Sequence, residues 1–208
     1  MKKTFLFLIL STFYLYAYSY PSFTTHELCS IEKSDRIAKN RILDYEKQIK
    51  CCSSLSRKKQ LQKINFYLNT LLPQYDAVIN KKEDNWETPK EFLRVGHGDC
   101  EDYVLIKYYS LIRLGFDEKK LFITVVKEKY YGGYHMVLSY FKYKGKSPLV
   151  LDNLSFKILP MSKRSDLEAQ YYINSTGVYK LLENNKLYKV ADKYKEFEEL
   201  QQKVSKNN

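Results

Sequence analysis

The chain lacks the features that divide a sequence into parts: it has no internal repeat, no low-complexity tract and no domain linker. Glycine and proline number only 7 and 5 among 208 residues, so turn-rich stretches are few. Hydrophobic residues make up 44% of the chain, which argues against a disordered protein and is enough for a core. The absence of any boundary therefore predicts a single folded domain.

A long block of basic residues is also missing, although the formal net charge is +11. Such an excess can indicate nucleic-acid binding, but the lysines are scattered among acids and tyrosines. We interpret the charge as a solvated, lysine-rich surface, with a mildly basic face for an acidic partner as the alternative. Nucleic acid is not an expected partner, because the N-terminus predicts export.

Only one long apolar run occurs, and it lies at the N-terminus. Two lysines precede the apolar residues 5–15, and small residues follow at Ala17 and Ser19. This order is typical of a secretory signal peptide, and the run is shorter than the ~20 residues that a membrane-spanning helix needs. We expect residues 1–19 to be removed and residues 20–208 to form a soluble domain outside the cytoplasm. An uncleaved membrane anchor is the alternative.

The cysteines lack the spacing of a zinc site, because no Cys-x-x-Cys pair occurs and the three histidines are dispersed. Cys29, Cys51, Cys52 and Cys100 remain after the leader. In an oxidising compartment, a bridge from Cys29 to Cys51 or to Cys52 is expected where geometry permits, whereas a vicinal bridge would be strained. The pairing stays open, and if one bridge forms, one further thiol is left over beside Cys100.

The first half of the chain has helical spacing of its hydrophobic residues, over about residues 33–114. A loose segment is expected before it, at residues 20–32. Within the helical part, Thr88 and Glu91 around Pro89 form a capping box, which is the sequence sign of a helix start.

The second half changes to the spacing of strands, over about residues 121–190. Short turns between the strands favour antiparallel pairing. A charged, exposed helix is expected at about residues 193–204. Helices followed by an antiparallel sheet make an α+β fold in one domain. The expected strands are residues 121–127, 134–140, 148–154, 178–182 and 186–190.

One stretch, residues 96–103, places a cysteine among acidic residues directly after a Gly-x-Gly turn. Residues 104–114 are expected to be helical, so Cys100 falls in the first turn with Asp99 as the N-cap. The helix dipole favours the thiolate of a cysteine in this position, whereas the flanking carboxylates oppose it. Cys100 is therefore a candidate nucleophile that needs a positive counterweight.

A thiolate nucleophile needs a base, and the base needs an orienting group. His135 and Asp152 each lie within an apolar strand, where the two polar groups would offset each other's cost of burial. If these strands are antiparallel neighbours, their ends bring both side chains to Cys100. The alternative is a packed strand histidine and a turn acid. His26 is a poorer base, as is His97, although His97 could shape the site locally.

Three carboxylates, those of Asp99, Glu101 and Asp102, surround the thiol. Hard oxygens clustered on one turn suit Ca²⁺, which takes six to eight oxygen ligands and tolerates irregular geometry. A bound cation and a protonated His135 are the two available counterweights. The residues alone favour the alternative, a helix N-terminus that is simply rich in acids.

Four sequence blocks stand in the order of a known family: Trp86-x-Thr88-Pro89-x-Glu91-Phe92-Leu93, Gly98-Asp99-Cys100-Glu101-Asp102-Tyr103, His135-Met136-Val137-Leu138 and Val150-Leu151-Asp152-Asn153-Leu154. Over about residues 33–160 the chain resembles the bacterial transglutaminase-like cysteine proteinases, in particular the periplasmic members that release large surface adhesins. The resemblance implies a papain-like, transglutaminase-type core with Cys100 as nucleophile, His135 as base and Asp152 as orienting group.

The same resemblance implies a calcium site formed by Asp99, Glu101 and Asp102, which reverses the preference of the residues alone. It implies a periplasmic, calcium-dependent endopeptidase that cuts an Ala-rich segment in the N-terminal region of a large adhesin. It also implies an inhibitory partner, an inner-membrane receptor for cyclic di-GMP. Trp86 could donate its indole N–H to the oxyanion, cover the cleft or pack in the core.

Two features depart from the family pattern, namely His97 and the Cys51–Cys52 pair, and the segment after Pro160 matches nothing in it. Two rival functions also remain. The first is an acyl transferase on the same core, because only the acceptor of the acyl group would differ. The second is a catalytically silent binding module, which the presence of Cys100, His135 and Asp152 disfavours.

Overall fold

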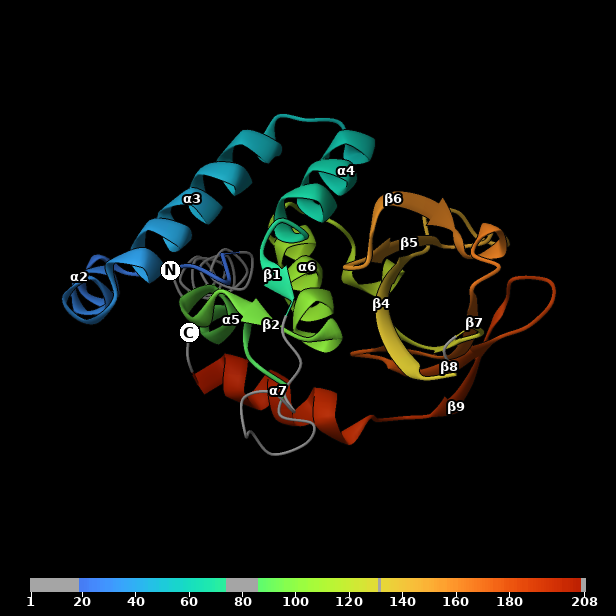
Figure 1. Ribbon diagram of the computed structural model, residues 1–208. Helices are drawn as coiled ribbons and strands as arrows, with labels where there is room; N and C mark the ends of the chain where they lie inside the picture. The colour runs from blue at the N-terminus through green and yellow to red at the C-terminus, as the bar shows by residue number, and fades with distance from the viewer. Residues whose placement is uncertain (1–18, 74–85, 131, 207–208) are drawn as a thin grey trace, which may run out of the picture.

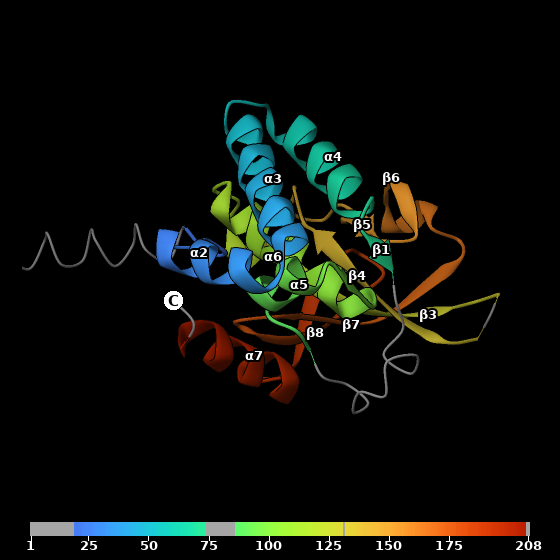
Figure 2. The same ribbon diagram turned by 60° about the vertical axis from the view of Figure 1, so that its left-hand side comes forward.

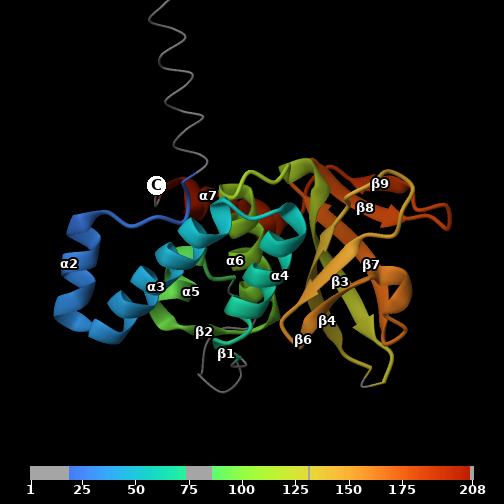
Figure 3. The same ribbon diagram turned by 90° about the horizontal axis from the view of Figure 1, so that it is seen from above.

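The computed structural model describes residues 19–73, 86–130 and 132–206, so nearly all of the expected leader lies outside the described residues. Figure 1 shows helices from the first half of the chain beside a curved sheet from the second half. Helix α6 (Cys100–Arg113) lies where the two parts meet, and the turned views in Figures 2 and 3 agree. The predicted α+β fold is confirmed.

The helical part begins earlier than the sequence pattern predicts. The expectation of a loose segment at residues 20–32 is wrong, because α2 (Thr25–Ser34) starts there with its own capping box. The Thr24 hydroxyl accepts from the Glu27 N–H, and the Glu27 carboxylate accepts from the Thr24 N–H. The next two helices are α3 (Arg36–Ser53) and α4 (Arg57–Leu68).

The predicted capping box at Thr88 is confirmed as the start of α5 (Pro89–Val95). This helix ends at Gly96, whose φ of 85° is the left-handed conformation that glycine adopts without strain. A two-residue strand, β2 (His97–Gly98), follows and pairs in parallel with β1 (Leu72–Pro73). The short segment between α5 and α6 is therefore held by the end of α5 at Gly96 and by the pairing of β2 with β1.

The second half forms a seven-stranded sheet in the described residues, in the order β6-β5-β4-β3-β7-β8-β9, with every neighbouring pair antiparallel. The five predicted strands are found, whereas β6 and β7 are not predicted, because both carry charged or polar residues that blur the strand pattern. The strands are β3 (Leu121–Glu128), β4 (Tyr134–Tyr140), β5 (Leu149–Asp152), β6 (Ser155–Pro160), β7 (Leu167–Asn174), β8 (Gly177–Leu181) and β9 (Leu187–Ala191).

The last helix, α7 (Lys195–Lys206), lies close to its predicted position, but the expectation that it is exposed is wrong. Its apolar residues Phe197, Leu200 and Val204 recur at helical spacing and are buried. Figure 1 shows that α7 leaves the sheet and returns to the helical part. The C-terminal segment therefore spans both parts of the molecule.

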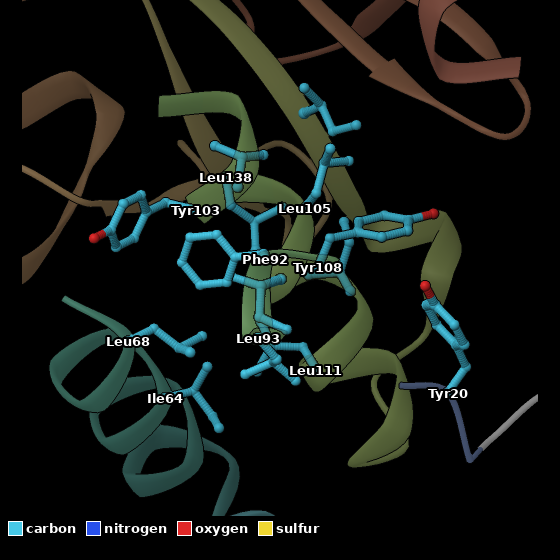
Figure 4. Packing of buried hydrophobic residues seen from close by; sticks show 14 of the residues in the cluster. Tyr20, Ile64, Leu68, Phe92, Leu93, Tyr103, Leu105, Tyr108, Leu111 and Leu138 are labelled. Carbon is cyan, nitrogen blue, oxygen red and sulfur yellow. The ribbon is translucent and has the colours of Figure 1, made fainter. Parts of the chain in front are cut away.

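One core joins the helices to the sheet, and a smaller cluster packs on the opposite face of the sheet. Adjacent residues Val137 and Leu138 of β4 belong to different clusters, as the alternation of side chains along a strand requires. Figure 4 shows the main core, in which α4, α5 and α6 supply Ile64, Leu68, Phe92, Leu93, Leu105, Tyr108 and Leu111.

The four cysteines are all among the described residues, and none forms a disulfide. Cys29 and Cys51 are exposed, whereas Cys52 is buried in the core, and its carbonyl accepts from the Gln60 amide of α4 at 3.0 Å. The expected bridge from Cys29 is therefore not found in this structure. Within the described part of the chain, no helix is long and apolar enough to cross a membrane.

Candidate active site

Cys100 is the first residue of α6, with Asp99 at the N-cap position as predicted. The turn before it depends on Gly98, because a Cβ there would lie 2.6 Å from Oδ2 of Asp102 and 3.0 Å from the Phe92 ring. Any side chain at this position must displace the first turn of the helix. The sequence therefore places the thiol at a helix N-terminus and holds it there sterically.

His135 and Asp152 lie on the neighbouring antiparallel strands β4 and β5, and their side chains meet. The His135 Nε2 atom is 2.9 Å from Oδ1 of Asp152, and the two side chains are only 7% and 1% exposed. Burial would raise the pKa of the Asp152 carboxyl, but hydrogen bonds from His135, Leu154 and Arg164 hold it well below its ordinary value.

The ionised Asp152 can only accept a hydrogen bond, so the neutral imidazole of His135 carries its proton on Nε2. The lone pair is then on Nδ1, which leaves that atom to act as a base. Helix α6 packs on β4, and the Cys100 sulfur interacts with the backbone of Met136, the residue after His135. Helix α6 therefore places the Cys100 sulfur against the strand that carries His135, and the His135 side chain contacts Asp152 of β5.

The surroundings of Cys100 favour the protonated thiol. Its Sγ donates to Oε2 of Glu101 at 3.2 Å. Burial, the Glu101 carboxylate and the charge of Asp99 raise the pKa of the Cys100 thiol well above its ordinary value. The acidic residues around the sulfur thus suppress the thiolate, as their sequence positions predict.

Asp102 is buried, and together with Asp99, Glu101 and Glu87 it forms what we call the acidic cluster. Its Oδ1 accepts from the backbone N–H of Glu87 at 2.9 Å and its Oδ2 from that of Asp99 at 3.3 Å. Burial, together with the charges of Glu87 and Glu101, raises the pKa of Asp102 to about 8. Glu87 is a member of this cluster that the sequence pattern did not single out.

The donor chemistry of this cluster fits a hard cation, because carboxylates that repel one another are what Ca²⁺ binds. In the described part of the chain, however, no group of three or more His, Cys, Asp or Glu side chains is arranged as a metal site. The three carboxylates of Asp99, Glu101 and Asp102 therefore lie near one another in sequence, and their charges act on the same first turn of α6. They do not form a complete set of metal ligands in this structure.

Arg164, which the sequence pattern did not identify, contacts Asp152 from the turn after β6. Its Nη2 donates to Oδ2 of Asp152 at 2.8 Å and to Oδ2 of Asp166 at 2.6 Å. The amide of Asn69 in the turn after α4 donates to the Asp152 carbonyl at 2.7 Å. Asp152 is therefore held through its carboxylate and through its backbone.

Lys107 is a second cation near Asp152 and is 1% exposed. Its Nζ has no hydrogen-bond partner among the described residues and lies 5.8 Å from the centre of the Tyr103 ring. Burial lowers the pKa of Lys107 to about 7, and the charge of Asp152 opposes this shift. Lys107 lies seven residues after Cys100 on α6. The sequence could have identified it, because a lysine on the apolar face of a predicted helix is unusual.

Three other residues were candidates from the sequence, namely Trp86, His97 and His26. Trp86 is buried and stacks on Tyr194 with ring centres 5.9 Å apart, which fits the packing interpretation of this residue. His97 is half-buried on β2, where its backbone pairs with Leu72. His26 is exposed on α2. Among the described residues, none of these three forms a hydrogen bond or an ion pair with His135 or Asp152.

Comparison with solved structures finds LapG of Legionella pneumophila. Its calcium-bound structure has a TM-score of 0.72 and 29% sequence identity, covering 84% of this chain and 98% of that one. A second LapG structure gives 0.73 and 29%, covering 88% and 97%. The EGTA-treated form gives 0.72 and 28%, covering 85% and 97%. The fold is thus of the transglutaminase-like type.

No curated protein matches the sequence. The family model described as bacterial transglutaminase-like cysteine proteinase BTLCP matches residues 26–175. This range contains Cys100, His135 and Asp152, as well as Arg164 in the turn after β6.

Proposed function

Because the chain belongs to the bacterial transglutaminase-like cysteine proteinases, we propose that it is a cysteine endopeptidase in which Cys100, His135 and Asp152 form the catalytic triad. The observation that carries this assignment is the 2.9 Å contact between His135 and Asp152, made on strands that lie against the helix of Cys100. The catalytic unit is the single domain of residues 20–208 that remains after removal of the leader.

The reaction begins when Nδ1 of His135 takes the proton from the Cys100 thiol, while Asp152 holds Nε2–H. The thiolate attacks the scissile carbonyl carbon, and the developing oxyanion is stabilised by the backbone N–H of Cys100 at the helix start. The imidazolium then gives its proton to the leaving amine, which leaves a thioester on Cys100. Water, deprotonated by His135, hydrolyses the thioester and restores the thiol.

Calcium is the proposed cofactor, held by Asp99, Glu101 and Asp102 with Glu87 nearby. The support is the buried, crowded state of these carboxylates, since burial together with the charges of Glu87 and Glu101 raises the pKa of Asp102 to about 8, and the calcium-bound form of the similar LapG. A bound cation supplies positive charge that offsets the carboxylates beside the thiol. Asp102 also holds the backbone N–H groups of Glu87 and Asp99, and so links the cluster to the turn before Cys100.

The proposed location is the periplasm, supported by the N-terminal leader pattern of residues 1–19 and the likeness to LapG. The proposed substrate is the N-terminal region of a large surface adhesin, whose cleavage would end attachment in a biofilm. An inner-membrane receptor for cyclic di-GMP is the proposed inhibitory partner. The support for this substrate and this partner is the resemblance of the sequence blocks around Cys100, His135 and Asp152 to the family.

The test uses the purified domain, residues 20–208, and the N-terminal segment of the adhesin from the same organism. We expect the wild-type protein to hydrolyse one peptide bond in the presence of calcium, and Cys100→Ala to leave the adhesin intact. Mass spectrometry of the products distinguishes a hydrolysed backbone from a new amide link made by an acyl transferase.

The control for this test is Cys29→Ala, an exposed cysteine on α2 that should leave cleavage unchanged. Cleavage by Cys100→Ala would contradict the nucleophile assignment. Equal cleavage with calcium and with excess EGTA would contradict the metal assignment and leave the triad intact. Failure of the wild-type protein to cut the adhesin under both conditions would contradict the substrate.

A further inference from the structure

Asp152 forms an ion pair with a residue from outside the resembling blocks. Arg164 lies in the turn after β6, and its Nη2 is 2.8 Å from Oδ2 of Asp152. The guanidinium is largely buried, with 10% of the side chain exposed, and Asp152 is 1% exposed. A charge-assisted bond between two groups so shielded from water is stronger than a surface ion pair.

The turn that carries Arg164 is itself held in place. The Asp166 carboxylate accepts from Nε of Arg164 at 2.9 Å and from Nη2 at 2.6 Å. The Asp166 carbonyl accepts from the Lys129 N–H at 2.9 Å, beyond the end of β3. At the other end of the turn, the Met161 N–H donates to the Pro148 carbonyl at 2.8 Å. Two other loops therefore fix where the guanidinium lies.

The two oxygens of Asp152 have different partners. Oδ1 accepts from Nε2 of His135 at 2.9 Å and from the Leu154 N–H at 3.0 Å, whereas Oδ2 accepts from Arg164. The titratable and charged groups that face Asp152 are therefore His135 from β4, Arg164 and Asp166 from the turn after β6, and Lys107 from α6. The Arg164 guanidinium keeps its charge at every working pH and bonds Oδ2 of Asp152 directly.

We propose that Arg164 is a positioning residue of the peptidase: by holding Oδ2 of Asp152, it keeps Oδ1 facing His135 and so fixes the imidazole relative to Cys100. The inference rests on the function proposed above for these three residues. Without Arg164 the carboxylate can rotate about its Cβ–Cγ bond, and the imidazole loses its fixed orientation. Such a loss lowers the rate of the chemical step and leaves substrate binding unchanged.

The test compares Arg164→Ala and Arg164→Lys with the wild-type protein. We expect Arg164→Ala to lower kcat about tenfold or more, with KM within about twofold, and Arg164→Lys to recover part of the loss through one N–H bond. The acid limb of the pH–rate profile should move to higher pH in Arg164→Ala. Its cause is the loss of one hydrogen bond that keeps Asp152 ionised, so the carboxyl protonates earlier as the pH falls.

The matched control is Lys163→Ala, an exposed neighbour in the same turn that should change neither kcat nor the acid limb. If Arg164→Ala does not fold, Asp166→Asn loosens the guanidinium while keeping its charge, and it should lower kcat by a smaller factor. An unchanged kcat and acid limb in a folded Arg164→Ala protein would overturn the inference. So would an equal loss of kcat in Lys163→Ala.

A second measurement needs no substrate, so it separates this inference from the proposed function. Long-range ¹H–¹⁵N spectra of ¹⁵N-histidine-labelled protein should show His135 of the wild-type protein as a single tautomer protonated on Nε2. We expect Arg164→Ala to show exchange between tautomers. A single Nε2–H tautomer in both proteins would overturn the inference even if the wild-type protein were an active peptidase.

Discussion

At the scale of single residues, Lys107 is held at a cost to stability. It is 1% exposed on α6, and burial lowers the pKa of its ammonium to about 7. Between about pH 7 and its ordinary pKa of 10.5, the unfolded chain binds a proton at Lys107 that the folded chain does not. The free energy of unfolding therefore rises with pH across this window, and the penalty of this residue is largest below it.

Replacement of Lys107 by methionine tests this cost. We expect Lys107→Met to raise the free energy of unfolding at pH 7 by about 1–4 kcal/mol, because the long side chain still fills the site and no charge is buried. The wild-type protein should gain stability relative to the variant as the pH rises from 7 to 10. Urea unfolding at several pH values measures both effects, and a variant that is less stable at pH 7 would contradict the argument.

The positions of Cys100, His135 and Asp152 could be proposed from the sequence because each has a local sign. Cys100 follows a glycine turn and an N-cap, and the other two are polar groups on apolar strands. Arg164 has no such sign, since it is one of 35 basic residues and its partner is brought to it by the folded sheet. Glu87 joins the acidic cluster for the same reason, through a contact with Asp102.

At the scale of elements, α7 is the clearest case of a helix that depends on tertiary packing. Its residues Phe197, Leu200 and Val204 are buried, whereas the rest of the helix is strongly charged. The Tyr194 ring, just before α7, stacks on Trp86, and Lys203 donates to the Trp86 carbonyl. Helix α7 therefore supports the segment that leads into Glu87 and α5.

Phe197→Ala tests this support. We expect the free energy of unfolding to fall by about 3–5 kcal/mol, because a buried aromatic side chain is lost and a cavity remains. The exposed Gln202 of the same helix supplies the control, since Gln202→Ala should change stability by less than about 0.5 kcal/mol. Chemical denaturation measures both variants, and equal effects would mean that α7 is not packed as described.

Helices and strands with a strong local sequence pattern can be predicted from the sequence, whereas elements that depend on pairing with distant strands cannot. Strand β4 was predicted with its observed ends because it alternates between two apolar clusters. Strands β6 and β7 were missed because charged or polar side chains interrupt them, and their pairing with β5 and β3 decides their conformation. Helix α2 was missed although its Thr24–Glu27 capping box is visible in the sequence.

At the scale of the whole molecule, the site lies where the helical part and the sheet meet. Helix α6 supplies Cys100, and the sheet supplies His135 and Asp152. The distance from the Cys100 thiol to His135, its proposed base, is therefore set by the packing of α6 on β4, not by any local turn. A ligand that stabilises the first turn of α6 should stabilise the complete fold.

Calcium removal tests this coupling. We expect the free energy of unfolding to rise with calcium concentration, by about 1.4 kcal/mol for each tenfold increase once the proposed site is saturated. Thermal unfolding of the wild-type protein in calcium and in EGTA measures the effect. Glu101→Gln should reduce it, whereas Glu199→Gln, an exposed carboxylate of α7, should not. An unfolding midpoint that is independent of calcium would exclude the proposed site.

The contact between Gly98 and Asp102 has a consequence for comparing genomes. A single methyl group at position 98 would lie 2.6 Å from the Asp102 carboxylate. A glycine at this position is therefore required for Asp102 to lie where it does. A natural relative that keeps counterparts of Cys100, His135 and Asp152 but replaces this glycine should have a displaced Asp102. We expect such a gene to encode an enzyme of altered or lost activity, which a search for the three proposed catalytic residues alone would count as active.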